Sequence, residues 1–145
     1  MFRIVYWKLN KKMNNKIIIA VVVIAAIVLV YKFFLSGPKS TGADIEPAEF
    51  GDLAKDKDAV ILDVRSGFEF GGDKITGAKN ISYTSGGFKG YIEKLDKSKT
   101  YLVYCASGSR SVGAVKTMKQ MGFENVYNLK GGIEHWKSAG MPVVR

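Results

Sequence analysis

The sequence predicts an α/β fold with a mostly parallel sheet that has helices on both faces. Short apolar segments rich in β-branched residues alternate along residues 44–145 with segments of helical periodicity, and this alternation is typical of parallel sheets. An apolar stretch over residues 17–35 also predicts one transmembrane helix before the fold. Because 145 residues are too few for two well-buried domains, we expect a single domain preceded by that segment.

Four apolar segments are predicted as buried strands. The clearest reads AVILDV and contains the β-branched residues that strands favour. The predicted strands span residues 59–64, 78–81, 101–105 and 126–129. Ligands of such sheets bind beyond the carboxyl ends of the strands, and Cys105 stands at one of these ends.

Helices are predicted between the strands, over residues 47–54, 66–71, 110–121 and 133–139. Pro47 is a favourable first helical residue, and Ser66 with Glu69 has the spacing of a capping box. Gly122 and Gly140 follow the last two segments, where glycine ends a helix.

The positive charge of the chain, +9 at pH 7, is unevenly distributed. Residues 1–43 contain seven of the 22 Lys and Arg residues and no acid, so residues 44–145 carry fifteen basic and thirteen acidic side chains. A nucleic-acid-binding surface needs several clustered cations on one face. The nearly neutral fold therefore argues against a nucleic-acid partner.

The apolar segment over residues 17–35 has Lys32 as its only charge and no polar face at helical spacing, which favours a transmembrane helix over a buried core helix. The basic flank over residues 1–16 holds five cations, so the positive-inside rule predicts a cytoplasmic N-terminus and an extracytoplasmic C-terminal domain. Residues 36–43 are small and polar and are predicted as a linker to the domain over residues 44–145.

Two alternatives stay open at the N-terminus. The small residues 41–43 suit a signal peptidase, and cleavage there would make the domain a secreted protein rather than a single-pass membrane protein. Met13 could be the true start in place of Met1, because the residues after it form a compact charged segment directly before the apolar run.

Cys105 is the only cysteine, which excludes an intrachain disulfide. His135 is the only histidine and has no cysteine near it in the sequence, so we expect no metal site and no bound cofactor. A lone cysteine is commonly a small buried apolar residue. The residues that follow Cys105 favour a reactive thiol instead.

The segment CASGSRS over residues 105–111 connects a predicted strand to a predicted helix. A loop that curls into a helix N-terminus directs backbone N–H groups inward, and these bind an anion together with the helix dipole. Gly108 permits backbone conformations closed to other residues, and Arg110 adds a cation suited to the oxyanion of a sulfur donor. We therefore predict that Cys105 is a nucleophile with a lowered pKa.

With this loop in view, the chain resembles the single-domain rhodanese sulfurtransferases. The resemblance covers about residues 44–143 and rests on motifs in the family's order. They are LDVR at 62–65 with EF at 69–70, ITGAKNI at 75–81, the Cys105 loop, and GGI at 131–133 followed by Trp136 and by AGMPV at 139–143. The resemblance implies a rhodanese-like fold, with a five-stranded parallel sheet flanked by helices.

The resemblance also implies roles for individual residues. Cys105 is the nucleophile and carries sulfur as a persulfide between a donor, such as thiosulfate or a persulfide, and a thiol or cyanide acceptor. Asp63 and Arg65 match the family's buried polar pair, which with Ser111 supports the site. The substrate cradle is the loop backbone, formed by Ala106, Ser107, Gly108, Ser109 and Arg110.

The chain departs from the family's pattern at two places. Lys74 and Thr76 replace a common His and Pro in the second motif, which changes the rigidity expected of that loop. Ala106 stands where many relatives carry Arg, so the Cys105 loop holds one cation where two are common. The second departure makes a persulfide or polysulfide donor plausible in place of thiosulfate.

Two other functions compete with sulfur transfer as interpretations of the sequence. A related phosphatase branch has seven residues from Cys to Arg, whereas residues 105–110 are six, and the shorter loop favours a single sulfur atom over phosphate. The alternative of another class is a non-catalytic, membrane-tethered module that binds or senses sulfur or docks a partner. The sequence identifies no protein partner.

Overall fold

The structure is a computed structural model that describes residues 17–28 and 43–145. Contacts within the chain divide it into two units, Met1–Lys39 and Ser40–Arg145, which are described separately below. The basic flank and residues 36–42 of the predicted linker lie outside the described residues.

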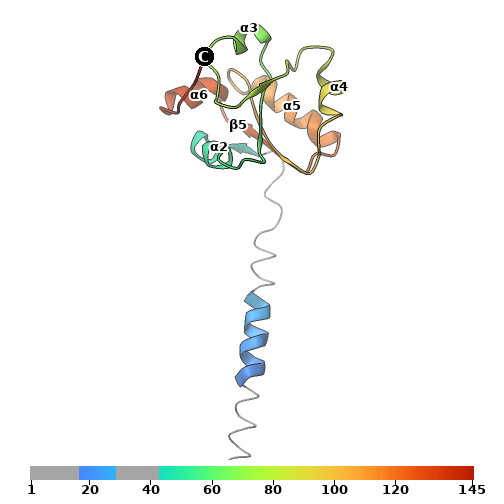
Figure 1. Cartoon of the computed structure of the whole chain (residues 1–145), viewed down its shortest axis with the longest axis vertical. Helices are drawn as coiled ribbons and strands as arrows, with labels where there is room; N and C mark the ends of the chain where they lie inside the picture. The colour runs from blue at the N-terminus through green and yellow to red at the C-terminus, as the bar shows by residue number, and fades with distance from the viewer. Residues whose placement is uncertain (1–16, 29–42) are drawn as a thin grey trace, which may run out of the picture. The chain divides into compact units, whose positions relative to one another are not determined.

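In the first unit, residues 17–28 form a helix (Figure 1) whose large apolar side chains are 46% to 62% exposed. Residues 29–35 of the predicted span lie outside the described residues. Over the ranges that the structure describes, no helix has both the length and the apolar character needed to cross a membrane. The described residues 17–28 would extend only about 18 Å at about 1.5 Å per residue, which is shorter than the roughly 30 Å hydrocarbon core of a bilayer. The transmembrane helix predicted over residues 17–35 is therefore not confirmed.

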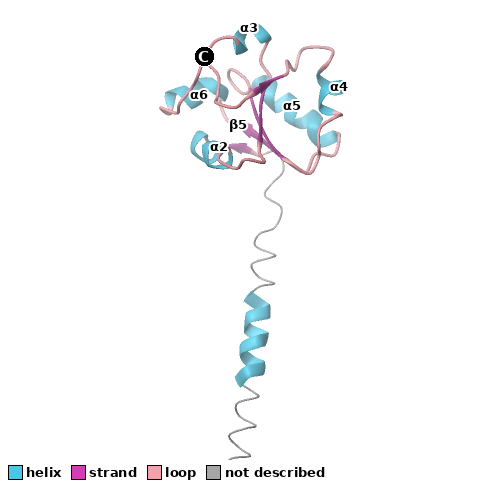
Figure 2. Cartoon of the chain, viewed as in Figure 1, coloured by secondary structure: helices cyan, strands magenta, loops and turns pink. Residues whose placement is uncertain are grey.

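The second unit contains a five-stranded sheet whose pairings are all parallel, in the order β1-β5-β4-β2-β3. Figure 2 shows the strands in magenta, enclosed by helices. Val60 and Val126 flank Tyr101 in the register of the three central strands. The strands are β1 (Asp44–Ile45), β2 (Val60–Asp63), β3 (Lys79–Asn80), β4 (Thr100–Tyr104) and β5 (Asn125–Leu129).

Five helices accompany the sheet: α2 (Pro47–Leu53), α3 (Gly67–Phe70), α4 (Phe88–Ile92), α5 (Ser109–Gln120) and α6 (Gly132–Ser138). One buried cluster joins the sheet to Phe88 of α4 and Met118 of α5, and the other joins it to Phe50 of α2 and Trp136 of α6. The helices therefore cover both faces of the sheet, as the sequence predicts (Figure 1). Burial of each such side chain contributes roughly 1.5–3 kcal/mol to the hydrophobic stabilisation of the fold.

The side chains of β4 alternate between the two clusters, as they must along a strand. Tyr101 and Val103 lie in the cluster of α4 and α5, whereas Leu102 and Tyr104 lie in the cluster of α2 and α6. Cys105 continues this alternation one residue past the strand and lies on the α5 face. The strand register thus directs its sulfur toward the beginning of α5.

Candidate active site

Cys105 lies at the carboxyl end of the central strand β4, between the ends of β2 and β5. Residues 106–108 lead directly into α5, which begins at Ser109. This is the edge of a parallel sheet at which ligands bind. The predicted loop is therefore placed where a strand meets a helix N-terminus.

The sulfur of Cys105 has two hydrogen-bond donors. The backbone N–H of Gly108 donates to Sγ at 3.1 Å, and the hydroxyl of Ser111 lies 3.4 Å from Sγ. The same hydroxyl lies 3.0 Å from the carbonyl oxygen of Gly108, and its single hydrogen satisfies only one of these acceptors at a time. Gly108 has φ +100°, a conformation that L residues with a side chain rarely adopt, and this conformation turns its amide toward the sulfur.

The N-terminus of α6 holds the other side of the loop. The backbone N–H of Ile133 donates to the carbonyl oxygen of Cys105 at 2.9 Å, and that of Glu134 donates to the carbonyl oxygen of Ala106 at 3.1 Å. A Cβ on Gly132, where φ is +64°, would collide with both carbonyl oxygens. Gly132 is thus a supporting residue that was not predicted for the site, although the GGI motif of the resemblance contains it.

Arg110 does not offer a free charge to the site. Its guanidinium forms a two-point ion pair with Glu69 of α3, at 2.8 Å from Nη1 to Oε2 and 2.7 Å from Nη2 to Oε1. The hydrogen bond from Arg110 and those from Ser66 hold the pKa of Glu69 far below its usual value, against the opposing effect of burial. The same pair raises the pKa of Arg110, to which the nearby Cys105 also contributes.

Asp63 and Arg65 form the pair that the resemblance implies. Asp63 is fully buried, and Nη2 of Arg65 lies 2.6 Å from Oδ2 of Asp63 and 2.9 Å from the carbonyl oxygen of Asp73. Burial by itself lowers the pKa of Arg65, but the hydrogen bonds and charge of Asp63 outweigh it and raise that pKa. The guanidinium also lies over the ring of Tyr104, 5.6 Å from its centroid, so the pair joins the carboxyl ends of β2 and β4.

Exposure differs sharply among the predicted site residues. Cys105 is 1% exposed and Ser111 is fully buried, whereas Ser107 and Ser109 face the solvent. Gly108 is buried, and Ala106 and Arg110 are partly exposed. The sulfur of Cys105 is therefore poorly accessible, because a reactant can touch it only by entering between loop residues or by displacing them.

No group of three or more His, Cys, Asp and Glu residues is arranged to hold a metal ion within residues 17–28 and 43–145. His135 lies on α6, where its Nδ1 is 3.0 Å from the carbonyl oxygen of Lys130.

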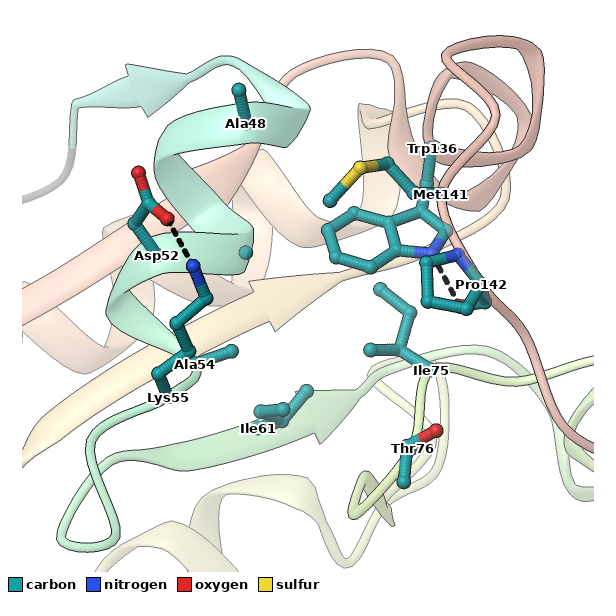
Figure 3. A pocket seen from close by; sticks show the side chains of 11 residues that line it. Ala48, Asp52, Ala54, Lys55, Ile61, Ile75, Thr76, Trp136, Met141 and Pro142 are labelled. Atoms are coloured by element: carbon teal, nitrogen blue, oxygen red, sulfur yellow. Dashed lines mark hydrogen bonds and ion pairs between the residues drawn. The ribbon is translucent and has the colours of Figure 1, made fainter.

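A cavity of about 470 Å³ lies on the α2 and α6 face of the sheet (Figure 3). Its apolar wall includes Ile61, Ile75 and Trp136, and the ion pair between Asp52 and Lys55 lies at its edge. It contains none of the predicted site residues. The cavity is therefore separate from the loop of Cys105.

The chain is similar in sequence to known rhodanese-like proteins. The family model of the rhodanese-like domain matches residues 46–139. A thiosulfate sulfurtransferase GlpE from Coxiella burnetii is 37% identical over 94 residues, which cover 65% of this chain and 86% of the relative.

Solved structures share the fold. A rhodanese-related protein from Thermoplasma volcanium has a TM-score of 0.63 and 33% identity, and the match covers 70% of this chain and 97% of that protein. A protein from Rhodopseudomonas palustris described as a possible tyrosine phosphatase has a TM-score of 0.63 and 27% identity, with 78% and 92% covered.

Proposed function

The chain belongs to the rhodanese-like domain family, and from this premise we propose that it is a sulfurtransferase that carries sulfane sulfur as a persulfide on Cys105. The observation that carries the proposal is the pair of donors at Sγ, the amide of Gly108 and the hydroxyl of Ser111. Hydrogen bonds to an ionised acceptor are roughly twice as strong as those to a neutral one. Such donors therefore favour a sulfur that becomes anionic during the reaction.

The first half-reaction loads the enzyme. The thiolate of Cys105 attacks the outer sulfur of the donor, so that a new S–S bond forms while the bond between that sulfur and the rest of the donor breaks. The electron pair of the broken bond departs with the leaving group, which is sulfite when the donor is thiosulfate and a thiolate when the donor is a persulfide. Cys105 then holds the sulfur as a persulfide.

The second half-reaction removes the sulfur from Cys105. A thiol or cyanide acceptor attacks the outer sulfur, the S–S bond breaks, and its electron pair returns to Cys105 as a thiolate. The product is a new persulfide or thiocyanate. The Gly108 amide and the Ser111 hydroxyl stabilise the charge that returns to Sγ.

The test uses the full chain and a Cys105→Ser variant. Thiosulfate, cysteine persulfide and polysulfide are supplied in turn, and intact-mass analysis asks whether the protein gains the mass of one sulfur atom. Thiocyanate formation from cyanide measures turnover. We expect the gain and the turnover in the wild type only. Equal turnover by the variant, or no gain with any donor, would overturn the proposal.

The near-complete burial of Cys105 favours one alternative, a module that binds sulfur or a partner without turnover. This alternative predicts no gain of mass and no thiocyanate from any donor. An aryl phosphate in the same assay tests the phosphatase function. Hydrolysis above the Cys105→Ser background would favour the phosphatase.

A separate proposal concerns location, namely that residues 17–35 anchor the chain in a membrane with the domain on the extracytoplasmic side. It is supported by the helix over residues 17–28, which exposes apolar side chains, and by the cations that precede it. The test is extraction of cell membranes with alkaline carbonate, followed by protease treatment of intact cells. Retention and external cleavage are expected. Recovery of a shortened soluble chain would instead indicate a cleaved signal peptide.

A further inference from the structure

The ion pair between Glu69 and Arg110 places a fixed negative charge beside the one cation of the Cys105 loop. We propose that Glu69 is a specificity-determining residue, which neutralises Arg110 and thereby selects persulfide donors over small oxyanionic donors such as thiosulfate. The inference rests on the proposed sulfur transfer and specifies its donor class.

The carboxylate of Glu69 is held on two sides. Both of its oxygens accept hydrogen bonds from Arg110, and Oε2 also accepts from the backbone N–H of Ser66 at 3.0 Å and from its hydroxyl at 2.7 Å. Ser66 and Glu69 together form the capping box that begins α3. The hydrogen bonds from Ser66 would therefore hold the carboxylate of Glu69 in place even if the side chain of Arg110 rotated away.

The pairing occupies the Nη1 and Nη2 edge of the Arg110 guanidinium, so an oxyanion must use the remaining N–H donors of a group whose charge Glu69 already neutralises. An Arg fork binds carboxylates and oxyanions through two parallel N–H bonds, and here the terminal nitrogens Nη1 and Nη2 of Arg110 both donate to Glu69. The side chains of Arg110 and Glu69 are 31% and 32% exposed, so solvent screens the pair only partly. The pair therefore adds no net charge at the mouth of the loop.

The two donor classes differ in the charge that they bring to this neutral pair. Thiosulfate is a dianion, so its reaction with the Cys105 thiolate gathers three negative charges and releases sulfite with two of them. A protonated persulfide, R–S–SH, gathers only the charge of the thiolate and releases R–S⁻. Thiosulfate therefore depends more strongly on an unpaired cation, and Glu69 neutralises the cation that the loop provides.

The experiment measures the rate constant for sulfur loading of Cys105 by rapid quench and intact-mass analysis, with thiosulfate and with cysteine persulfide as donors. Its readout is the selectivity ratio, defined as the thiosulfate rate constant divided by the cysteine persulfide rate constant. A Glu69→Gln variant keeps the capping-box geometry, because glutamine also serves at that position. We expect it to raise the selectivity ratio roughly tenfold at low salt, with a smaller rise at high salt.

Two further variants test whether Arg110 is the charge that Glu69 controls. Arg110→Gln should lower the selectivity ratio, since it leaves the carboxylate without its partner. The double variant Glu69→Gln, Arg110→Gln should show no tenfold rise. If the selectivity ratio rose as much in the double variant as in Glu69→Gln, the proposal would be overturned, because the rise would then not depend on Arg110.

The matched control is Glu124→Gln, an exposed glutamate that precedes β5 at the opposite end of the strands from Cys105. Its selectivity ratio should equal that of the wild type, and thermal unfolding checks that each variant is folded. If the wild type loads from cysteine persulfide and the Glu69→Gln ratio is unchanged, this inference alone fails. If neither the wild type nor any variant gains sulfur from either donor, the proposed sulfur transfer itself is wrong.

Discussion

The hydroxyl of Ser111 lies 3.4 Å from the sulfur of Cys105, on the first turn of the helix that follows the Cys105 loop. The two residues are six positions apart, and the loop brings them together because Gly108 turns the chain with a positive φ. Ser111 is fully buried, so water cannot replace its hydroxyl without a rearrangement.

A Ser111→Ala variant should therefore slow the transfer of sulfur from the persulfide of Cys105 to cyanide, because this is the step in which negative charge returns to Sγ. Loss of one hydrogen bond to a charged group costs about 1.5–3 kcal/mol, which corresponds to a reduction of roughly tenfold or more in the rate constant. Rapid quench with intact-mass analysis measures it. The control is Ser138→Ala, which removes an exposed hydroxyl on α6 and should leave the rate unchanged. A wild-type rate in Ser111→Ala would show that the amide of Gly108 suffices.

A Gly132→Ala variant should destabilise the fold and displace the Cys105 loop. The added Cβ would collide with the carbonyl oxygens of Cys105 and Ala106, and a backbone φ of +64° is unfavourable for alanine. Strain of this kind costs about 1–3 kcal/mol of unfolding free energy. Urea denaturation measures the loss, and the loading assay measures the effect on the loop.

The matched control for that variant is Gly90→Ala in α4. A Cβ at Gly90 meets no atom within 4 Å, and alanine in a helix interior is favoured over glycine by about 0.5–1 kcal/mol. It should therefore raise the unfolding free energy. Stability of Gly132→Ala equal to the wild type would mean that α6 shifts away from the loop without cost.

An Asp63→Asn variant should lose about 3–5 kcal/mol of unfolding free energy, because it leaves the buried guanidinium of Arg65 without a counter-charge. Urea denaturation measures this loss. The control is Asp52→Asn, which breaks an ion pair with Lys55 whose side chains are 74% and 78% exposed. Exposed pairs contribute about 0.2–1 kcal/mol, so the control should lose far less. Similar losses in both variants would contradict a structural role for the buried pair.

Much of the fold could be predicted from local patterns. The capping box of Ser66 and Glu69 is present at the start of α3, and the helix predicted to stop at Gly122 is observed as α5. The predicted central strands differ from β2, β4 and β5 by at most one residue at either end. Periodicity and caps are local signals, and they identified the elements that have enough residues to show them.

Two elements show no such signal. β1 consists of Asp44–Ile45, and its hydrogen bonds come from β5, about 80 residues later in the chain. α4 is five residues long with Gly90 in its middle, so neither propensity nor periodicity marks it. Both elements depend on tertiary contacts, which a pattern within a few residues cannot express.

The same distinction holds for the candidate site. The residues of the Cys105 loop are adjacent in sequence and could be proposed together. The pairing of Arg110 with Glu69 joins positions 41 apart, and the contact of α6 with the loop joins Ile133 to Cys105. The sequence therefore predicted a cation at the loop, whereas the structure shows that this cation is paired.

The Glu69–Arg110 pair should also make stability depend on pH in a defined direction. The hydrogen bond from Arg110 lowers the pKa of Glu69 in the folded state, so the folded protein binds a proton only at a lower pH than the unfolded chain, for which the value is 4.5. The stability from this pair is complete above that value and is lost as the pH falls toward the folded pKa.

Urea denaturation of the wild type and of Glu69→Gln at about pH 6 and about pH 3.5 measures this dependence. We expect the wild type to be the more stable protein at the higher pH and the gap between the two to narrow at the lower pH. A gap of constant size would show that Glu69 is no better stabilised as an anion in the folded protein than in the unfolded chain, and the neutral pair at the mouth of the loop would then lose its physical basis.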